Sequence, residues 1–180
     1  MLWNEIISII CMFCSAGICC ISLQGQTKLK ILFIQLFACL FYLANYLFVI
    51  NINATALIGV ITASCEILRL IAFYFIEKSE KYNTFKFNFI CAMFFNVILI
   101  TLSIIAWSSW FSFLPLVGAI LVNLSLSTKN VVLIKFAFVI QAALVITFLI
   151  LSGLFINAIP QMFICIFGIV GIVKLDKQKQ

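Results

Sequence analysis

Long apolar runs alternate with short polar connections along the whole chain. A bilayer core about 30 Å thick is crossed by about 20 helical residues, and each run has roughly that length. The pattern therefore predicts an all-α, polytopic membrane protein with seven transmembrane helices. The expected spans are residues 2–22, 31–50, 54–76, 87–105, 108–127, 131–151 and 154–173.

Composition strengthens this interpretation and excludes a soluble domain. Of the 180 residues, 66% are hydrophobic and only 9% are charged, which is more apolar surface than so small a globule could bury. The net charge of +6 comes from lysines scattered between the runs, with no basic face for nucleic acid. The N-terminus has no basic segment of a cleaved signal, so we expect the first span to be retained. The expected partner is the lipid bilayer, and no nucleic acid.

The lysines predict how the helices cross the membrane. They follow the first, third, fifth and seventh spans, whereas residues 51–54, 106–109 and 152–153 contain no Lys or Arg. An odd number of spans places every lysine on one side, so the positive-inside rule predicts an outer N-terminus and a cytoplasmic C-terminus. The lysines concerned are Lys28, Lys30, Lys78, Lys81, Lys86, Lys129, Lys135, Lys174, Lys177 and Lys179.

Two stretches of the chain suggest an internal repeat. Residues 17–28 and 118–129 align without a gap and share a Gly, a Leu, a Thr and a Lys. Because they belong to the first and fifth spans, they predict two parallel three-helix repeats joined by a linker helix. The alternative is chance similarity between two apolar helices. The predicted units are residues 1–76 (first repeat), 77–106 (cytoplasmic loop and linker helix), 107–173 (second repeat) and 174–180 (basic tail).

Glu66 and Arg69 lie well inside the apolar run of the third span, in one stripe with Thr55, Gly59 and Thr62 at helical spacing. A charge at this depth costs at least about 2.5–3.5 kcal/mol, so both residues should face protein or a water-filled cavity. A structural alternative is an ion pair that neutralises itself and fastens this helix to its neighbours. The functional interpretation makes Glu66 a proton- or cation-binding group, with Arg69 its charge partner or the contact for an anionic solute.

Other polar residues in the spans extend the candidate site. An amide in hydrocarbon must find a partner, so amide side chains should point into the bundle. Pro160 removes a backbone hydrogen bond, as the broken helices of transporters do, although prolines near helix starts are also simply tolerated. Stripes of small and polar residues in the first, second and fourth spans predict faces that pack into the bundle. The predicted solute-binding residues are Glu66, Arg69, Asn45, Asn157, Gln161 and Pro160.

The eight cysteines all lie in apolar runs, where a thiolate is disfavoured and a thiol acts as a small hydrophobe. Cys11 and Cys14 have the spacing of a redox or zinc motif, but the chain has no His to complete a common zinc set. We therefore expect packing cysteines, no metal and no cofactor. With no paired acidic motif and no long loop, the chain is not expected to be an enzyme.

The segment 107–118, read WSSWFSFLPLVG, is followed by a polar turn at Thr128, Lys129 and Asn130. Together with residues 63–73 around Arg69, it resembles the bacterial inner-membrane YgjV family. That resemblance implies a bacterial inner-membrane location and a three-one-three helix plan similar to the SWEET, PQ-loop and nicotinamide-riboside transporter groups. The chain differs from the PQ-loop pattern because its only Pro-Gln pair lies in the seventh span.

These observations predict a small-solute transporter with a central polar cavity, working by movement of one helix triplet against the other. The alternative is a non-transporting membrane assembly or sensory protein whose centre is filled by side chains. A small polar solute is the expected ligand. Whether the protein forms a homo-oligomer is left open by the sequence.

Overall fold

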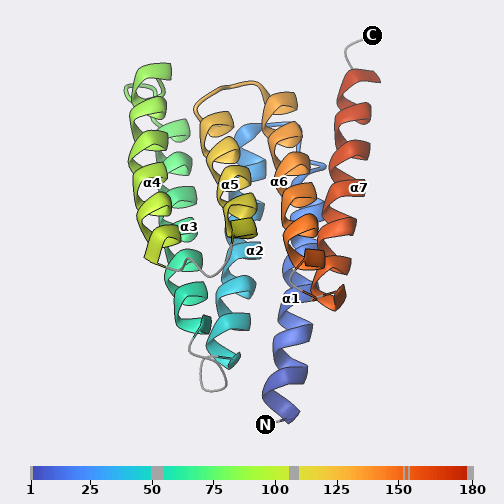
Figure 1. Cartoon of the computed structure of the whole chain (residues 1–180). Coiled ribbons are helices and arrows are strands. Elements are labelled where there is room, and N and C mark those ends of the chain that lie inside the picture. The colour runs from blue at the N-terminus through green and yellow to red at the C-terminus, as the bar shows by residue number, and fades with distance from the viewer. Residues whose placement is uncertain (1, 50–54, 106–109, 152, 154, 178–180) are drawn as a thin grey trace.

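The computed structural model describes the chain except for residues 1, 50–54, 106–109, 152, 154 and 178–180 (Figure 1). The described part folds into seven α-helices and one short 3-10 helix, which confirms the all-α class. The elements are α1 (Leu2–Ser22), α2 (Lys28–Val49), α3 (Thr55–Lys78), α4 (Phe85–Ile105), η1 (Trp110–Ser112), α5 (Phe113–Leu126), α6 (Val131–Leu151) and α7 (Phe155–Lys177).

Four helices contain stretches that are long and apolar enough to cross a membrane: Lys28–Phe48, Phe85–Ile105, Val131–Leu151 and Asn157–Leu175. Two shorter apolar stretches lie in α1 and α5. Large apolar side chains cover the outside of the bundle, and Phe94, Ile104 and Ile166 are each more than half exposed. Such faces suit contact with lipid tails, and the chain is a multi-span helical membrane protein.

The helices form a ring in the order of the chain. Each helix packs against the next one, and α7 returns to pack against both α6 and α1. Figure 1 shows that the connections after α1, α3 and α5 lie at the same end of the bundle as the C-terminus. We call this end the lysine end, because the lysine-bearing connections predicted from the sequence gather there.

The hydrophobic core is densest toward the lysine end. Its largest fully buried apolar side chains come from α2, α3, α5 and α6 and from the residue that follows α1, and each is at most 1% exposed. Close packing of this kind leaves no room for water, so these side chains close the bundle at that end. They are Leu23, Ile31, Leu32, Leu70, Phe73, Val122, Leu126 and Ile134.

Lys28, the first residue of α2, forms an ion pair in addition to adding positive charge at the lysine end. Its side chain is 3% exposed, its Nζ lies 2.9 Å from Oε2 of Glu77 on α3, and it lies 5.6 Å from the centre of the Phe73 ring. A buried ammonium is tolerated when a carboxylate compensates it. The ion pair therefore ties the start of α2 to the end of α3.

Lys135 is buried as well, although the sequence placed it beside the turn between the fifth and sixth spans. It lies within α6, is 1% exposed, and its Nζ donates a hydrogen bond to the carbonyl oxygen of Gly171, 3.1 Å away. One helical turn earlier on α7, the carbonyl oxygen of Phe167 accepts a 2.9 Å hydrogen bond from Gln24 Nε2. Side chains from two neighbours thus bind the backbone of α7.

The small and polar stripe of α1 packs into the bundle, as predicted. Ser15 Oγ donates to the carbonyl oxygen of Ala38 at 2.9 Å, and Ser22 Oγ donates to Gln35 Oε1 at 2.8 Å. On α4, Asn88 and Ala92 are buried in the same way. In lipid, these bonds and close contacts replace the hydrophobic drive that joins helices in water.

Ser15 supports a first prediction. Changing Ser15 to Ala removes one interhelical hydrogen bond, so we expect unfolding in mixed micelles to become easier by about 0.6 kcal/mol, the average worth of such a bond. Cys14→Ala, on the exposed side of the same helix, is the matched control and should change nothing measurable. Equal stability of the two variants would show that the Ser15 bond does not hold α1 to α2.

Candidate functional site

Arg69 on α3 is buried inside the bundle. Its side chain is 3% exposed, and Nη1 donates a hydrogen bond of 2.6 Å to Oδ1 of Asn123 on α5. Asn123 is fully buried. An arginine this deep cannot lose its proton, so its positive charge must be stabilised by the protein around it.

Asn123 carries the contact on to a third helix. Its Nδ2 donates a 2.6 Å hydrogen bond to Oδ1 of Asn96 on α4, which is 4% exposed. The direction of this bond follows from the first one, because the guanidinium only donates and therefore requires the oxygen of Asn123. Arg69, Asn123 and Asn96 form a chain of two hydrogen bonds, the first of them charge-assisted, that joins α3, α5 and α4. We call it the Arg69 chain.

Glu66 is held more loosely. Its Oε1 lies 3.8 Å from Nη2 of Arg69, at the long limit of an ion pair, and its side chain is 27% exposed. Oε2 lies 3.8 Å from the Sγ of Cys39 on α2. The closest polar partner of Arg69 is therefore a neutral amide, while the carboxylate of Glu66 keeps an accessible side.

The face of α2 opposite Glu66 carries two tyrosines beyond Cys39. Tyr46 Oη donates to Tyr42 Oη at 3.3 Å, and their rings meet edge to face with centroids 5.1 Å apart. Cys39, Tyr42 and Tyr46 are spaced by three and four residues, so they lie on one face of α2. Glu66 thus contacts a thiol on a face of α2 that also carries two phenols, groups that can exchange hydrogen bonds with a carboxylate.

Asn45 lies half-buried further along α2 from Tyr42, away from the lysine end. Its Oδ1 accepts a short hydrogen bond from Ser8 Oγ on α1. The predicted inward orientation of Asn45 is thus explained by a partner on the neighbouring helix. The bond joins α1 to α2, and Asn45 is not a member of the Arg69 chain.

The three predicted residues of α7 differ in burial. Asn157 is exposed, Gln161 is half-buried, and Pro160 is buried inside the helix. Among the residues that the structure describes, no hydrogen bond or ion pair connects them to the acid or the guanidinium. The reason lies in the ring order, because α7 packs against α6 and α1 while Arg69 reaches toward α5.

Sequence reasoning missed Asn123 and did not assign Asn96 to the site. Both are amides within apolar helices. Because an amide in an apolar span needs a hydrogen-bond partner, the sequence did contain a signal for each. Asn96 was expected only to face the bundle. Thr55 and Gly59 of the predicted stripe belong to α3, but the side chain of Thr55 and the surroundings of Gly59 lie outside what the structure describes.

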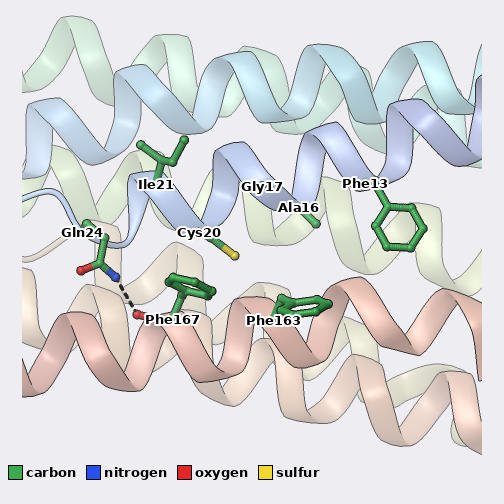
Figure 2. Close-up of a pocket in the computed structure, with 8 residues that line it drawn as sticks. All are labelled: Phe13, Ala16, Gly17, Cys20, Ile21, Gln24, Phe163 and Phe167. Atoms are coloured by element: carbon green, nitrogen blue, oxygen red, sulfur yellow. Dashed lines mark hydrogen bonds between the residues drawn. The ribbon is translucent and has the colours of Figure 1, made fainter.

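A pocket lies elsewhere in the bundle, between α1 and α7 (Figure 2). Its volume is about 320 Å³, and its lining is almost entirely apolar. None of the six predicted solute-binding residues is part of this lining. The lining residues are Phe13, Ala16, Gly17, Cys20, Ile21, Gln24, Phe163 and Phe167.

Fold and site define the class of this protein as a multi-span helical membrane protein with a buried arginine network among its helices. The chain matches no protein-family model, no curated protein and no solved structure. The resemblance to the YgjV family stays a prediction, as does the three-one-three repeat plan.

Proposed function

We propose that this protein is a small-solute transporter of a bacterial inner membrane, with seven spans, an outer N-terminus and a cytoplasmic C-terminus. The observation that carries the proposal is the arrangement of Glu66 beside Arg69. The guanidinium is fixed by Asn123, and the carboxylate, 27% exposed, faces the polar groups of α2. Intramembrane charges are costly, and they commonly mark the path of an ion or solute.

The loose ion pair supports a binding role for Glu66. Arg69 has its 2.6 Å bond to Asn123 in addition to the 3.8 Å contact with Glu66, so in this proposal the carboxylate can turn toward a solute while the guanidinium keeps one hydrogen bond. A pair built only for stability would favour a shorter, two-bonded contact. Small polar solutes with a donor or cationic group suit a carboxylate that contacts the face of α2 carrying Tyr42 and Tyr46.

The two ends of the bundle differ in packing, which supports a path from one side. Leu32, Leu70 and Phe73 close the lysine end with at most 1% exposure, whereas Tyr42 and Asn45, further from that end on α2, are half-buried. A carrier that alternates between two sides needs one side shut at a time. In this proposal the structure corresponds to the state closed at the cytoplasmic side.

Uptake into proteoliposomes tests the proposal. Purified protein is assayed with a panel of radiolabelled amino acids, sugars, nucleosides and polyamines against protein-free vesicles. For a solute that is taken up, Glu66→Gln should lower the rate at least about tenfold, the loss expected when a contact worth about 1.4 kcal/mol is removed. Glu80→Gln, in the exposed connection after α3, is the matched control and should transport normally.

A non-transporting assembly protein is the second candidate, and one observation favours it. Arg69, Asn123 and Asn96 are at most 4% exposed, so none of them offers a surface to a solute. In that case the Arg69 chain only holds α3, α4 and α5 together, and Glu66 only balances the charge of Arg69. Folded protein that accumulates no member of the panel, or uptake unchanged in Glu66→Gln, would favour this candidate over the transporter.

A further inference from the structure

The groove between α1 and α7 is open toward the outside of the bundle. Phe13, Ile21, Phe163 and Phe167 line it and are 41–61% exposed, so they face whatever surrounds the helices. Figure 2 shows the two rings of α7 lying along the strip that separates this helix from α1. At Gly17, a Cβ would meet no atom within 4 Å, which leaves the middle of the groove empty.

One end of the groove is polar. Gln24 lies there, with its Nε2 donating to the carbonyl oxygen of Phe167 (Figure 2). Gln24 follows α1 at the lysine end, whereas Phe13 lies almost three helical turns away from it. The groove therefore runs from the interior of the membrane toward its surface.

Positive charge gathers beside the polar end. Gly171 lies against Leu23 and Gln24, and the exposed Lys174 follows it by slightly less than one turn of α7. Lys135, bound to the carbonyl of Gly171, is close enough to Lys174 for their charges to interact. The exposed ammonium group of Lys174 therefore lies toward the end of the groove nearest the membrane surface, while the buried Lys135 adds positive charge behind it.

We propose that this groove binds an anionic phospholipid, with one acyl chain along α1 and α7 and the phosphate group beside Gln24 and Lys174. The apolar lining suits a hydrocarbon chain, and the amide and ammonium groups suit a phosphate at headgroup depth. Basic pockets between helices at the cytoplasmic side of membrane proteins recognise lipids in this way. The proposal requires the membrane class of the protein and is independent of transport.

Native mass spectrometry of the purified protein, titrated with phosphatidylglycerol or with phosphatidylcholine of the same acyl chains, tests the headgroup. We expect tighter binding of phosphatidylglycerol, and Lys174→Gln should weaken it about fivefold, the contribution of one lysine near the membrane surface. Lys86→Gln is the matched control, because Lys86 is an exposed lysine at the same end of the bundle, on α4. Equal affinities for the two lipids, or equal effects of the two substitutions, would overturn the proposal.

A second variant tests the acyl chain. Gly17→Leu fills the groove without touching protein atoms at its Cβ, so it should reduce binding of phosphatidylglycerol while the protein stays folded. Cys14→Leu adds similar bulk to the exposed side of α1, outside the lining, and should bind lipid normally. Unchanged lipid binding in Gly17→Leu overturns the proposal. The proposal is also overturned if the parent protein is a dimer and Gly17→Leu dissociates it, because the groove would then be a contact between two copies of the protein.

Discussion

Replacing Asn123 with alanine is expected to lower the free energy of unfolding by about 1.5–3 kcal/mol, the worth of a hydrogen bond to a charged group. The substitution removes the closest acceptor of Arg69, 2.6 Å from its Nη1, and leaves a guanidinium that is 3% exposed with only the distant oxygen of Glu66. Asn96 loses its donor at the same time. Reversible unfolding in mixed micelles by increasing dodecyl sulfate measures the loss.

Asn123→Asp is the informative control for this prediction. The carboxylate still accepts from Arg69 and adds a compensating charge, and Asn96 can turn its amide so that its nitrogen donates to the new oxygen. We therefore expect Asn123→Asp to be at least as stable as the parent. A similar loss in the alanine and aspartate variants would mean that shape at position 123, and not its oxygen, stabilises the bundle.

Gly171→Ala is expected to separate α7 from α1. A Cβ at this position overlaps the backbone carbonyl oxygen of Leu23, which cannot move aside as a flexible side chain could. Overpacking of this kind costs about 1–3 kcal/mol. The unfolding midpoint in detergent should fall, and the bonds that Gln24 and Lys135 make to the backbone of α7 should weaken with it.

Gly17→Ala provides the matched comparison on the facing helix. Its Cβ enters open space, so alanine should raise stability by about 0.5–1 kcal/mol through its better helix propensity. If alanine raises stability at position 17 and lowers it at position 171, the close approach of the helices, and not helix propensity, decides the effect at Gly171. A stable Gly171→Ala variant would show that α1 and α7 can move apart at little cost.

The helices and the central pair were predictable from local pattern. Apolar runs of membrane length gave the helix positions, and a spacing of three residues placed Glu66 and Arg69 on one face, where the structure pairs them. The inward direction of the α1 stripe and of Asn96 followed from the cost of an unpaired polar group in hydrocarbon. Each of these conclusions depends on residues close together in the chain.

The partners of these residues could not be predicted in the same way. Asn123 lies 54 positions from Arg69, and nothing local distinguishes it from another buried amide. That Asn157 and Gln161 share a site with Arg69 stays a prediction, because the ring order gives only the neighbours of α7, which are α1 and α6. The close approach of Gly171 to Leu23 could not be predicted either, because this contact appears only once two helices are packed.

The gathering of lysine-bearing connections at one end has a consequence for biogenesis. With that end in the cytoplasm, as proposed, the segments 51–54, 106–109 and 152–153 must be translocated, and none of them carries a Lys or Arg. Neighbouring helices can then enter the bilayer as hairpins, because the connection that crosses first carries no positive charge to oppose its translocation. A single lysine placed in one of these connections should delay insertion of that hairpin without affecting insertion of the others.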